Sequence, residues 1–89
     1  MKSRTTAGFR EAFAGLPAAI QEQARRDYQR FLHDPWTPSL RLKRVHANLP
    51  IYSVRIGKFY RALGRKDESG IVWFWIGSHA DYDKLLSQF

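Results

Sequence analysis

The sequence predicts an α+β fold. An N-terminal helical hairpin packs on a twisted, mainly antiparallel four-stranded sheet, and a short helix ends the chain. Three observations predict this fold: helically spaced apolar residues before residue 34, short apolar runs separated by glycine and polar residues over 40–76, and a helix-capping signal after them. With 89 residues, the chain is predicted to be a single domain, 1–89, with one modest core.

Two helices are predicted at the N-terminus. Apolar residues recur at helical spacing from Phe9 to Leu16, and Thr6 is a suitable N-cap. Pro17 fits the first turn of a second helix, where its missing N–H is not needed. That helix ends before Pro35, because the residue before a proline avoids the α region.

The sheet is predicted from alternating or wholly apolar runs. Gly57-Lys58 predicts a tight reversal, and 64–70 predicts a loop. Residues 2–6 fit a short additional first strand, but few of them are apolar. The four predicted strands cover 40–45, 51–56, 59–65 and 71–76, the last apolar on both faces and therefore central. Ser78 to Asp81 matches a capping box that opens a helix over 80–87.

The charge is concentrated in one part of the chain. The net charge is +7, yet residues 35–66 hold eight Lys or Arg and no acid, whereas 67–89 have a net charge of −3. An acid-free basic block in a folded domain is typical of proteins that bind polyanions, although a solvated surface without a ligand would look the same.

Several classes are excluded by composition. Zero cysteines exclude disulfides, cysteine zinc sites and a thiol nucleophile. Three scattered histidines argue against a metal site, so we expect no cofactor. No apolar run approaches the roughly 20 residues that span a bilayer, and the N-terminus has no apolar signal region. We expect a cytoplasmic protein that does not contact membranes.

The remaining chemistry is that of Arg, Lys, His and Tyr. These side chains can cleave RNA without a metal, because cations stabilise the phosphate charge and histidine transfers protons near neutral pH. Four motifs in order resemble the RelE/ParE superfamily of bacterial type II toxins over about residues 8–86. They are Leu42-Lys43-Arg44-Val45, Tyr52-Ser53-Val54-Arg55-Ile56, Tyr60-Arg61 and Ile76-Gly77-Ser78-His79-Ala80-Asp81-Tyr82.

The resemblance implies a function and partners. RelE-like members are ribosome-associated mRNA endonucleases that inhibit translation, so the expected partners are mRNA, the ribosome and a cognate acidic antitoxin. Two alternatives stay open: a ParE-like DNA gyrase inhibitor, and an inactive toxin-like nucleic-acid-binding domain. His79 with Arg55 and Arg61 favours the nuclease, because gyrase inhibition needs no proton-transfer group.

The resemblance also assigns site residues. It implies phosphate binding by Arg61, a basic contact from Arg55, general acid catalysis by His79 and an aromatic contribution from Tyr82. The predicted RNA-binding residues are Lys43, Arg44, His46, Lys58 and Arg65. Some members use a glutamate or a lysine pair as base, but here Ser53 stands at one lysine position. His46, Lys43 or the ribosome are candidates for that role.

Structural roles are the alternative for the same residues. His79 also fits the first turn of the last helix, and Tyr82 fits a packing residue on the sheet. Arg61 would then be a strand charge paired with Asp81 or Asp83, and His46 a turn residue. The run 73–75 is predicted to be core, because it has no polar face.

Overall fold

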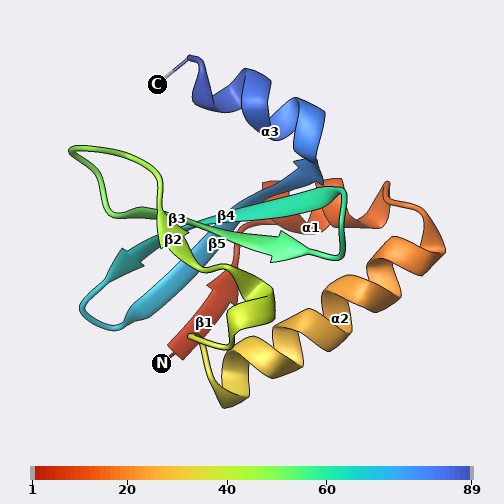
Figure 1. The fold of residues 1–89 in the computed structure, drawn as a ribbon, viewed down its shortest axis with the longest axis horizontal. Coiled ribbons are helices and arrows are strands. Elements are labelled where there is room, and N and C mark those ends of the chain that lie inside the picture. Colours follow the sequence, from red (N-terminus) through yellow and green to blue (C-terminus); the bar gives the residue numbers. More distant parts are fainter. Residues whose placement is uncertain (1, 89) are drawn as a thin grey trace.

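The computed structural model describes residues 2–88 (Figure 1). Its elements in chain order are β1 (Lys2–Thr5), α1 (Ala7–Ala14), α2 (Ala18–His33), a short 3-10 helix (Pro38–Leu40), β2 (Lys43–Arg44), β3 (Ile51–Ile56), β4 (Tyr60–Asp67), β5 (Gly70–Ser78) and α3 (His79–Leu86). The predicted α+β class is confirmed, but two details of the architecture differ.

The sheet has five strands in the order β1-β5-β4-β3-β2, not four. The possible strand at 2–6 forms as β1 and pairs in parallel with β5, so the sheet is mixed. The other neighbouring strands pair antiparallel, as predicted. β1 gives little sequence signal because backbone hydrogen bonds attach it to β5 at the sheet edge, where polar residues are tolerated.

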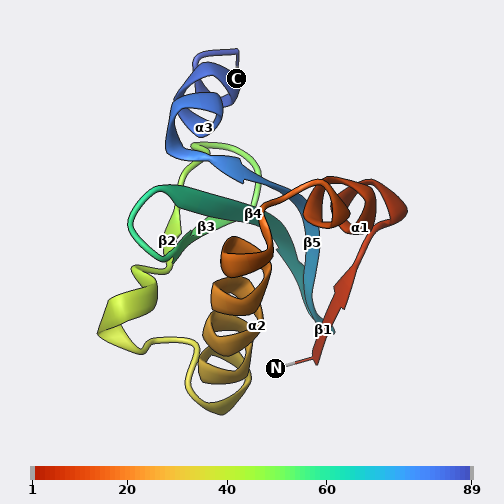
Figure 2. The same cartoon turned by 90° about the vertical axis from the view of Figure 1, so that its right-hand side faces the viewer.

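The two N-terminal helices diverge instead of forming a hairpin (Figure 2). α1 packs against β5 and α2 packs against β3, on the same face of the sheet. The connection imposes this: the amides of Gly15 and Leu16 still bond to α1 carbonyls, and Pro17 is extended, with φ −55° and ψ 147°. The chain therefore enters α2 in a new direction, and an open space is left between the helices.

Both predicted helix caps are confirmed. The Thr6 hydroxyl accepts a hydrogen bond from the Phe9 amide at 3.1 Å. The Ser78 hydroxyl accepts one from the Asp81 amide, also at 3.1 Å, and α3 begins directly after it. These bonds satisfy amides that a helix N-terminus leaves without partners.

Two predicted segment boundaries are wrong. The strand expected over 40–45 is only Lys43–Arg44, because Leu40 is buried in the 3-10 helix and Arg41 adopts a left-handed φ of 48°. The loop expected over 64–70 is mostly strand. Gly64 lies within β4, where an added Cβ would come 2.7 Å from the Trp73 ring. That glycine serves close packing and not a turn.

The core has two clusters, one on each face of the sheet. We call the face covered by α1 and α2 the helical face, and the opposite face, against which α3 packs, the open face. The helical face holds the larger cluster, including Phe31, which meets Trp73 edge-on at 5.2 Å. The open face holds Ile51, Leu63 and Tyr82. The predicted core run 73–75 divides between the faces. Strand alternation places Trp73 on the helical face and Phe74 on the open face, and a register shift in the β4–β5 pairing leaves Trp75 on the open face as well.

Candidate functional site

Two arginines face one another on the open face. Arg55 of β3 is the direct cross-strand partner of Arg61 of β4, and Gly77 of β5 is the partner of Arg61 on its other side. Both arginines are half-buried. Like charges at directly opposite positions destabilise a sheet. Among residues 2–88 no carboxylate forms a salt bridge with either arginine; the ion pairs join Arg30 to Asp27 and His79 to Asp83.

Arg61 is held against an aromatic ring and has an unmet donor. Its guanidinium carbon lies 5.5 Å from the centre of the Tyr82 ring, a cation–π contact. Its Nη1 atom is buried without a hydrogen-bond partner. The predicted alternative, an ion pair with Asp81 or Asp83, is not what the structure contains. An unmet buried donor costs about 1–3 kcal/mol, so an incoming acceptor would recover that energy.

A second unpaired polar atom lies two residues before Arg55 on β3, on the same face. Ser53 is fully buried, and its hydroxyl has no hydrogen-bond partner. Its cross-strand partners are Leu63 on β4 and Lys43 on β2, so the exposed Lys43 side chain shares the open face with the arginines. The open face therefore combines cations with unsatisfied donors.

His79 is the first residue of α3 and lies beside the β3–β4 turn. Its amide donates to the carbonyl of Phe59 at 2.7 Å. Its ring Nδ1 lies 3.2 Å from an oxygen of Asp83, one helical turn later, and the ring centre lies 5.8 Å from that of Tyr82. The imidazole is half-exposed. Because Nδ1 is oriented by Asp83, Nε2 is the nitrogen left for proton transfer to a ligand.

Tyr82 is placed as a packing residue. It is buried in the open-face cluster, and its ring centre lies 6.4 Å from that of Trp75. It contacts both Arg61 and His79. Its ring therefore holds these two side chains in place, which is the structural alternative predicted for it.

Arg44 and His46 brace a loop. The Arg44 Nε donates to the carbonyls of His46 and Leu49 at 3.1 and 3.3 Å. The His46 Nδ1 accepts from the amides of Asn48 and Leu49. A neutral ring with Nδ1 used as acceptor carries its proton on Nε2, so this arrangement does not suit His46 as a general base. The predicted alternative, a turn residue, describes it better.

The remaining predicted RNA-binding cations are exposed at two different places. Arg65 lies on β4 opposite Ile51, further along the open face from the arginine pair. Lys58 lies in the turn between β3 and β4. Register and alternation thus place Lys43, Arg55, Arg61 and Arg65 on one face, with His79 at its end.

The sequence interpretation missed one buried acid, Asp27 of α2. Its carboxylate accepts from the side chains of Gln23 and Arg30 and from the amide of Gly57 at 3.2 Å. It thereby ties α2 to the β3–β4 turn. A signal was present, since Asp27 lies three residues after Ala24 and four before Phe31, within the apolar stripe of the helix.

Residues 2–88 contain no cluster of three His, Cys, Asp or Glu side chains arranged to hold a metal ion. Nor does any helix in this range have the length and apolar content to cross a membrane. The site offers cations, one imidazole and buried donors.

Comparison with known proteins places the chain in a family. Residues 18–84 match the family model of the ParE-like toxin domain. The chain belongs to this family. The match confirms the predicted resemblance to RelE/ParE toxins. No curated protein sequence matches the chain.

Solved structures of related toxins have the same fold as this ParE-like domain. The RelBE2 toxin–antitoxin complex of Mycobacterium tuberculosis matches with a TM-score of 0.70 and 20% identity, over 88% of this chain and 96% of that one. The RelB-RelE complex of Methanococcus jannaschii gives 0.69 and 13%, over 91% and 95%. A mutant of the Escherichia coli toxin RelE in the free state gives 0.62 and 14%, over 98% and 95%.

Proposed function

We propose that this ParE-like toxin is a metal-independent, ribosome-dependent mRNA endonuclease that inhibits translation in the cytoplasm. One observation carries the proposal: Arg55 and Arg61 lie directly opposite each other without a carboxylate partner, and a buried nitrogen of Arg61 is unpaired. An RNA phosphate would offset the repulsion, and it would accept the unmet hydrogen bond once the half-buried guanidinium of Arg61 turns toward it. Arginine suits this role, because its planar fork binds phosphate oxygens in pairs.

The proposed reaction uses the RNA as its own nucleophile. The 2′-oxygen attacks the adjacent phosphorus, the bond to the 5′-oxygen breaks, and a 2′,3′-cyclic phosphate and a 5′-hydroxyl form. Arg55 and Arg61 stabilise the charge that develops on the phosphate. His79 donates a proton from Nε2 to the leaving 5′-oxygen. The proton of the 2′-hydroxyl passes to Lys43 or to a group of the ribosome, since the turn geometry of His46 argues against that residue.

The gyrase alternative is kept because the matching family model is described as ParE-like. One experiment separates the two functions. The wild-type protein is added to ribosomes programmed with a labelled mRNA and, in parallel, to a DNA gyrase supercoiling assay. We expect 5′-hydroxyl cleavage products and unchanged supercoiling. Intact mRNA with inhibited gyrase would overturn the endonuclease.

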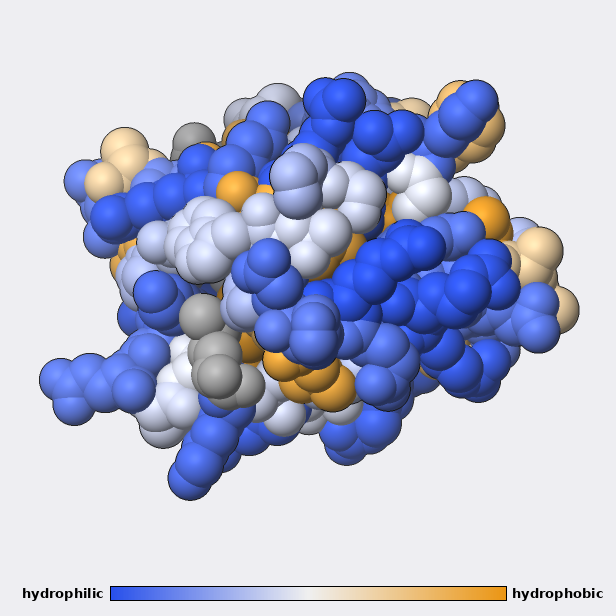
Figure 3. All heavy atoms as spheres, turned by 60° about the horizontal axis from the view of Figure 1, so that its bottom comes forward, coloured by the Kyte–Doolittle hydropathy of each residue, from blue (hydrophilic) through white to orange (hydrophobic). Residues whose placement is uncertain are grey.

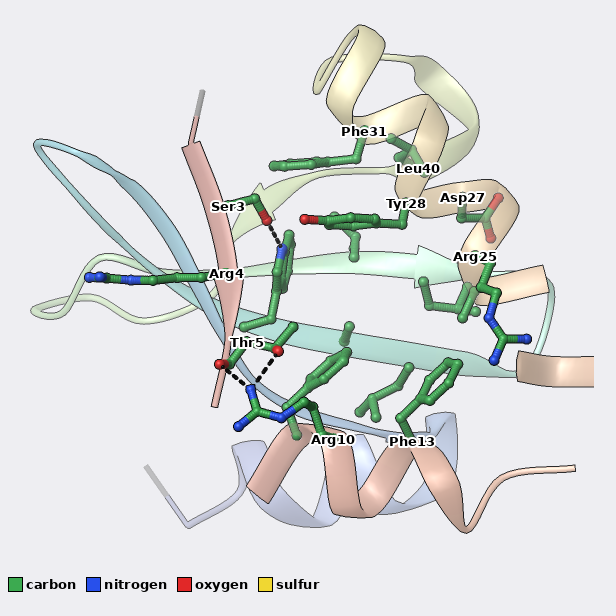
Figure 4. A pocket seen from close by; sticks show the side chains of 17 residues that line it. Ser3, Arg4, Thr5, Arg10, Phe13, Arg25, Asp27, Tyr28, Phe31 and Leu40 are labelled. Atoms are coloured by element: carbon green, nitrogen blue, oxygen red, sulfur yellow. Dashed lines mark hydrogen bonds between the residues drawn. The ribbon is translucent and has the colours of Figure 1, made fainter. Parts of the chain in front are cut away.

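We further propose an acidic antitoxin that inserts an amphipathic helix between α1 and α2. Two of the structurally similar toxins are in complexes with antitoxins. The diverging helices leave a cleft of about 580 Å³ above the helical face (Figure 4). Its apolar lining includes Phe9, Phe13, Tyr28, Phe31, Ile56 and Ile76. This lining suits the apolar stripe of a partner helix.

The charge around the cleft favours an acidic partner. Arg10 and Arg25 lie at its edges, where Arg10 bonds to Thr5 and Arg25 lies 5.2 Å above the Phe13 ring (Figure 4). On the side of the molecule seen in Figure 3, apolar residues appear only as small patches between hydrophilic ones. Association with the antitoxin should slow as salt rises. On-rates that are independent of salt would contradict this electrostatic docking.

A further inference from the structure

The β3–β4 turn presents a large apolar side chain to solvent. Phe59 is 70% exposed, more than any other large apolar residue among 2–88; the next is Trp36 at 63%. The other phenylalanines among residues 2–88 are at least partly buried. Phe59 differs from them, because folding removes little of its apolar surface from water. The β3–β4 turn that holds it covers only 57–59.

This turn is fixed from three sides. The Gly57 amide donates to the buried Asp27 carboxylate at 3.2 Å. The Gly57 carbonyl accepts from Arg55 Nε at 2.7 Å, and Gly57 itself has a positive φ of 57°, which suits glycine. The Phe59 carbonyl accepts from the His79 amide at 2.7 Å. A buried acid, a site arginine and the proposed general acid thus position one exposed aromatic ring.

We propose that Phe59 is a stacking platform for a nucleobase next to the cleaved phosphate, with Lys58 contacting the RNA backbone. This inference rests on the proposed endonuclease function. Sequence-specific and nonspecific proteins alike bind unpaired bases on exposed aromatic rings, flanked by cations for the backbone. Phe59 meets both conditions: its backbone is bonded to that of His79, and Lys58 beside it is exposed. Phe59 would then hold the base beside the cut in place, whatever its identity.

The test measures stacking directly. Ribosomes are programmed with mRNA that carries 2-aminopurine beside the expected cut, and a 2′-deoxy group there blocks cleavage. Wild-type protein and Phe59→Tyr should quench the fluorescence, whereas Phe59→Leu should abolish the quenching and weaken binding about 5- to 150-fold, the size of one base–aromatic stack. Trp36→Leu is the matched control, because it removes a similarly exposed aromatic from the loop that follows α2.

Three outcomes are informative. Quenching that Phe59→Leu leaves unchanged would overturn the inference, while cleavage of mRNA by the same preparations would leave the proposed function standing. If Phe59→Leu weakens antitoxin binding but not quenching, Phe59 is a protein contact and the inference is wrong. If wild-type protein neither cleaves nor quenches, the endonuclease proposal itself fails. Thermal midpoints of all variants should agree closely, because both rings are exposed.

Discussion

The two faces of the sheet differ in which groups they leave unsatisfied. On the helical face, buried polar groups are paired: Asp27 accepts from three donors, and the Trp73 indole donates to the Ser3 hydroxyl at 3.0 Å. On the open face, Arg61 Nη1 and the Ser53 hydroxyl are buried without partners. Each unpaired group costs about 1–3 kcal/mol in a chain whose total stability is modest.

Each face is incomplete in a different chemical sense. The helical face has satisfied polar groups but an apolar cleft between α1 and α2. The open face is well filled with apolar side chains around Leu63, yet its arginines have no anions. The apolar cleft of the helical face suits a helix of a partner protein, and the unpaired arginines of the open face suit a phosphate. Under the proposed function, the antitoxin would act on the helical face and the chemistry would take place on the open face.

The largest expected effect of a substitution is on the open face, at His79. His79→Ala should lower the cleavage rate about 100- to 10,000-fold, because a general acid is lost. Its imidazole is half-exposed, so the free energy of unfolding should change by less than about 1 kcal/mol. His33→Ala, an exposed histidine at the end of α2, is the control and should stay active. If His79→Ala is fully active, His79 is not the general acid and serves only as the first residue of α3.

Arg61→Ala should lower the cleavage rate about 100- to 1,000-fold, by analogy with the loss of one charge-stabilising donor in an enzyme. Stability should hardly fall, because the substitution also removes an unpaired buried donor. Arg65→Ala is a matched control, since it removes an exposed arginine from the same strand and face. Equal losses for both variants would indicate nonspecific attraction of RNA instead of a phosphate site. Single-turnover cleavage and thermal melts decide between these outcomes.

Asp27→Ala tests the helical face and should act mainly on stability. It leaves the Gly57 amide without its partner and frees Arg30 and Gln23. We expect a loss of about 2–3 kcal/mol in the free energy of unfolding, measured by urea titration. Glu22→Ala, an exposed acid on the same helix, should cost little. If Asp27→Ala melts like wild type, the turn that carries Phe59 is not held by this carboxylate.

The sequence predicted local signals well and distant partners poorly. The caps at Thr6 and Ser78 depend on bonds to residues three positions away, so a short pattern was sufficient. The pairing of the two arginines did not follow from the sequence: the predicted two-residue reversal at Gly57-Lys58 would place Arg55 opposite Tyr60, whereas the turn covers 57–59 and places Arg55 opposite Arg61. β1 was only a possibility, since its partner β5 lies about 70 residues later in the chain.

The errors share a physical cause, which is tertiary packing. Gly64 reads as a turn residue but is required by the Trp73 ring, a contact that no sequence window contains. For Tyr82 the sequence left a site role and a packing role open, and the direction of α3, which buries the ring, is also set by tertiary packing. The sequence interpretation did not consider Asp27, whose carboxylate gains its partner in the β3–β4 turn only when that turn lies against α2. Each assignment depended on which face of the sheet an element covers.

The smallest expected effect is at the β4–β5 connection, which belongs to neither face and serves as a reference for a satisfied polar group. There Asp67 Oδ1 accepts from the Ser69 hydroxyl and amide at 2.7 and 2.8 Å and from the Gly70 amide at 3.1 Å. These bonds, the Ser69 hydroxyl first, lower the pKa of Asp67 below its ordinary value of 3.8.

A lowered folded-state pKa means that the ionised carboxylate favours the folded chain. Its contribution is present above the unfolded pKa, near 3.8, and is lost as pH falls through the folded pKa. The stability difference between wild type and Asp67→Asn should therefore shrink on acidification below about pH 4. Glu68→Gln removes the same charge from the adjacent exposed position. The stability difference between this variant and wild type should not shrink below about pH 4. Urea titrations at several pH values measure both differences. Parallel curves for the two variants would mean that the charge of this loop matters and the hydrogen bonds of Asp67 do not.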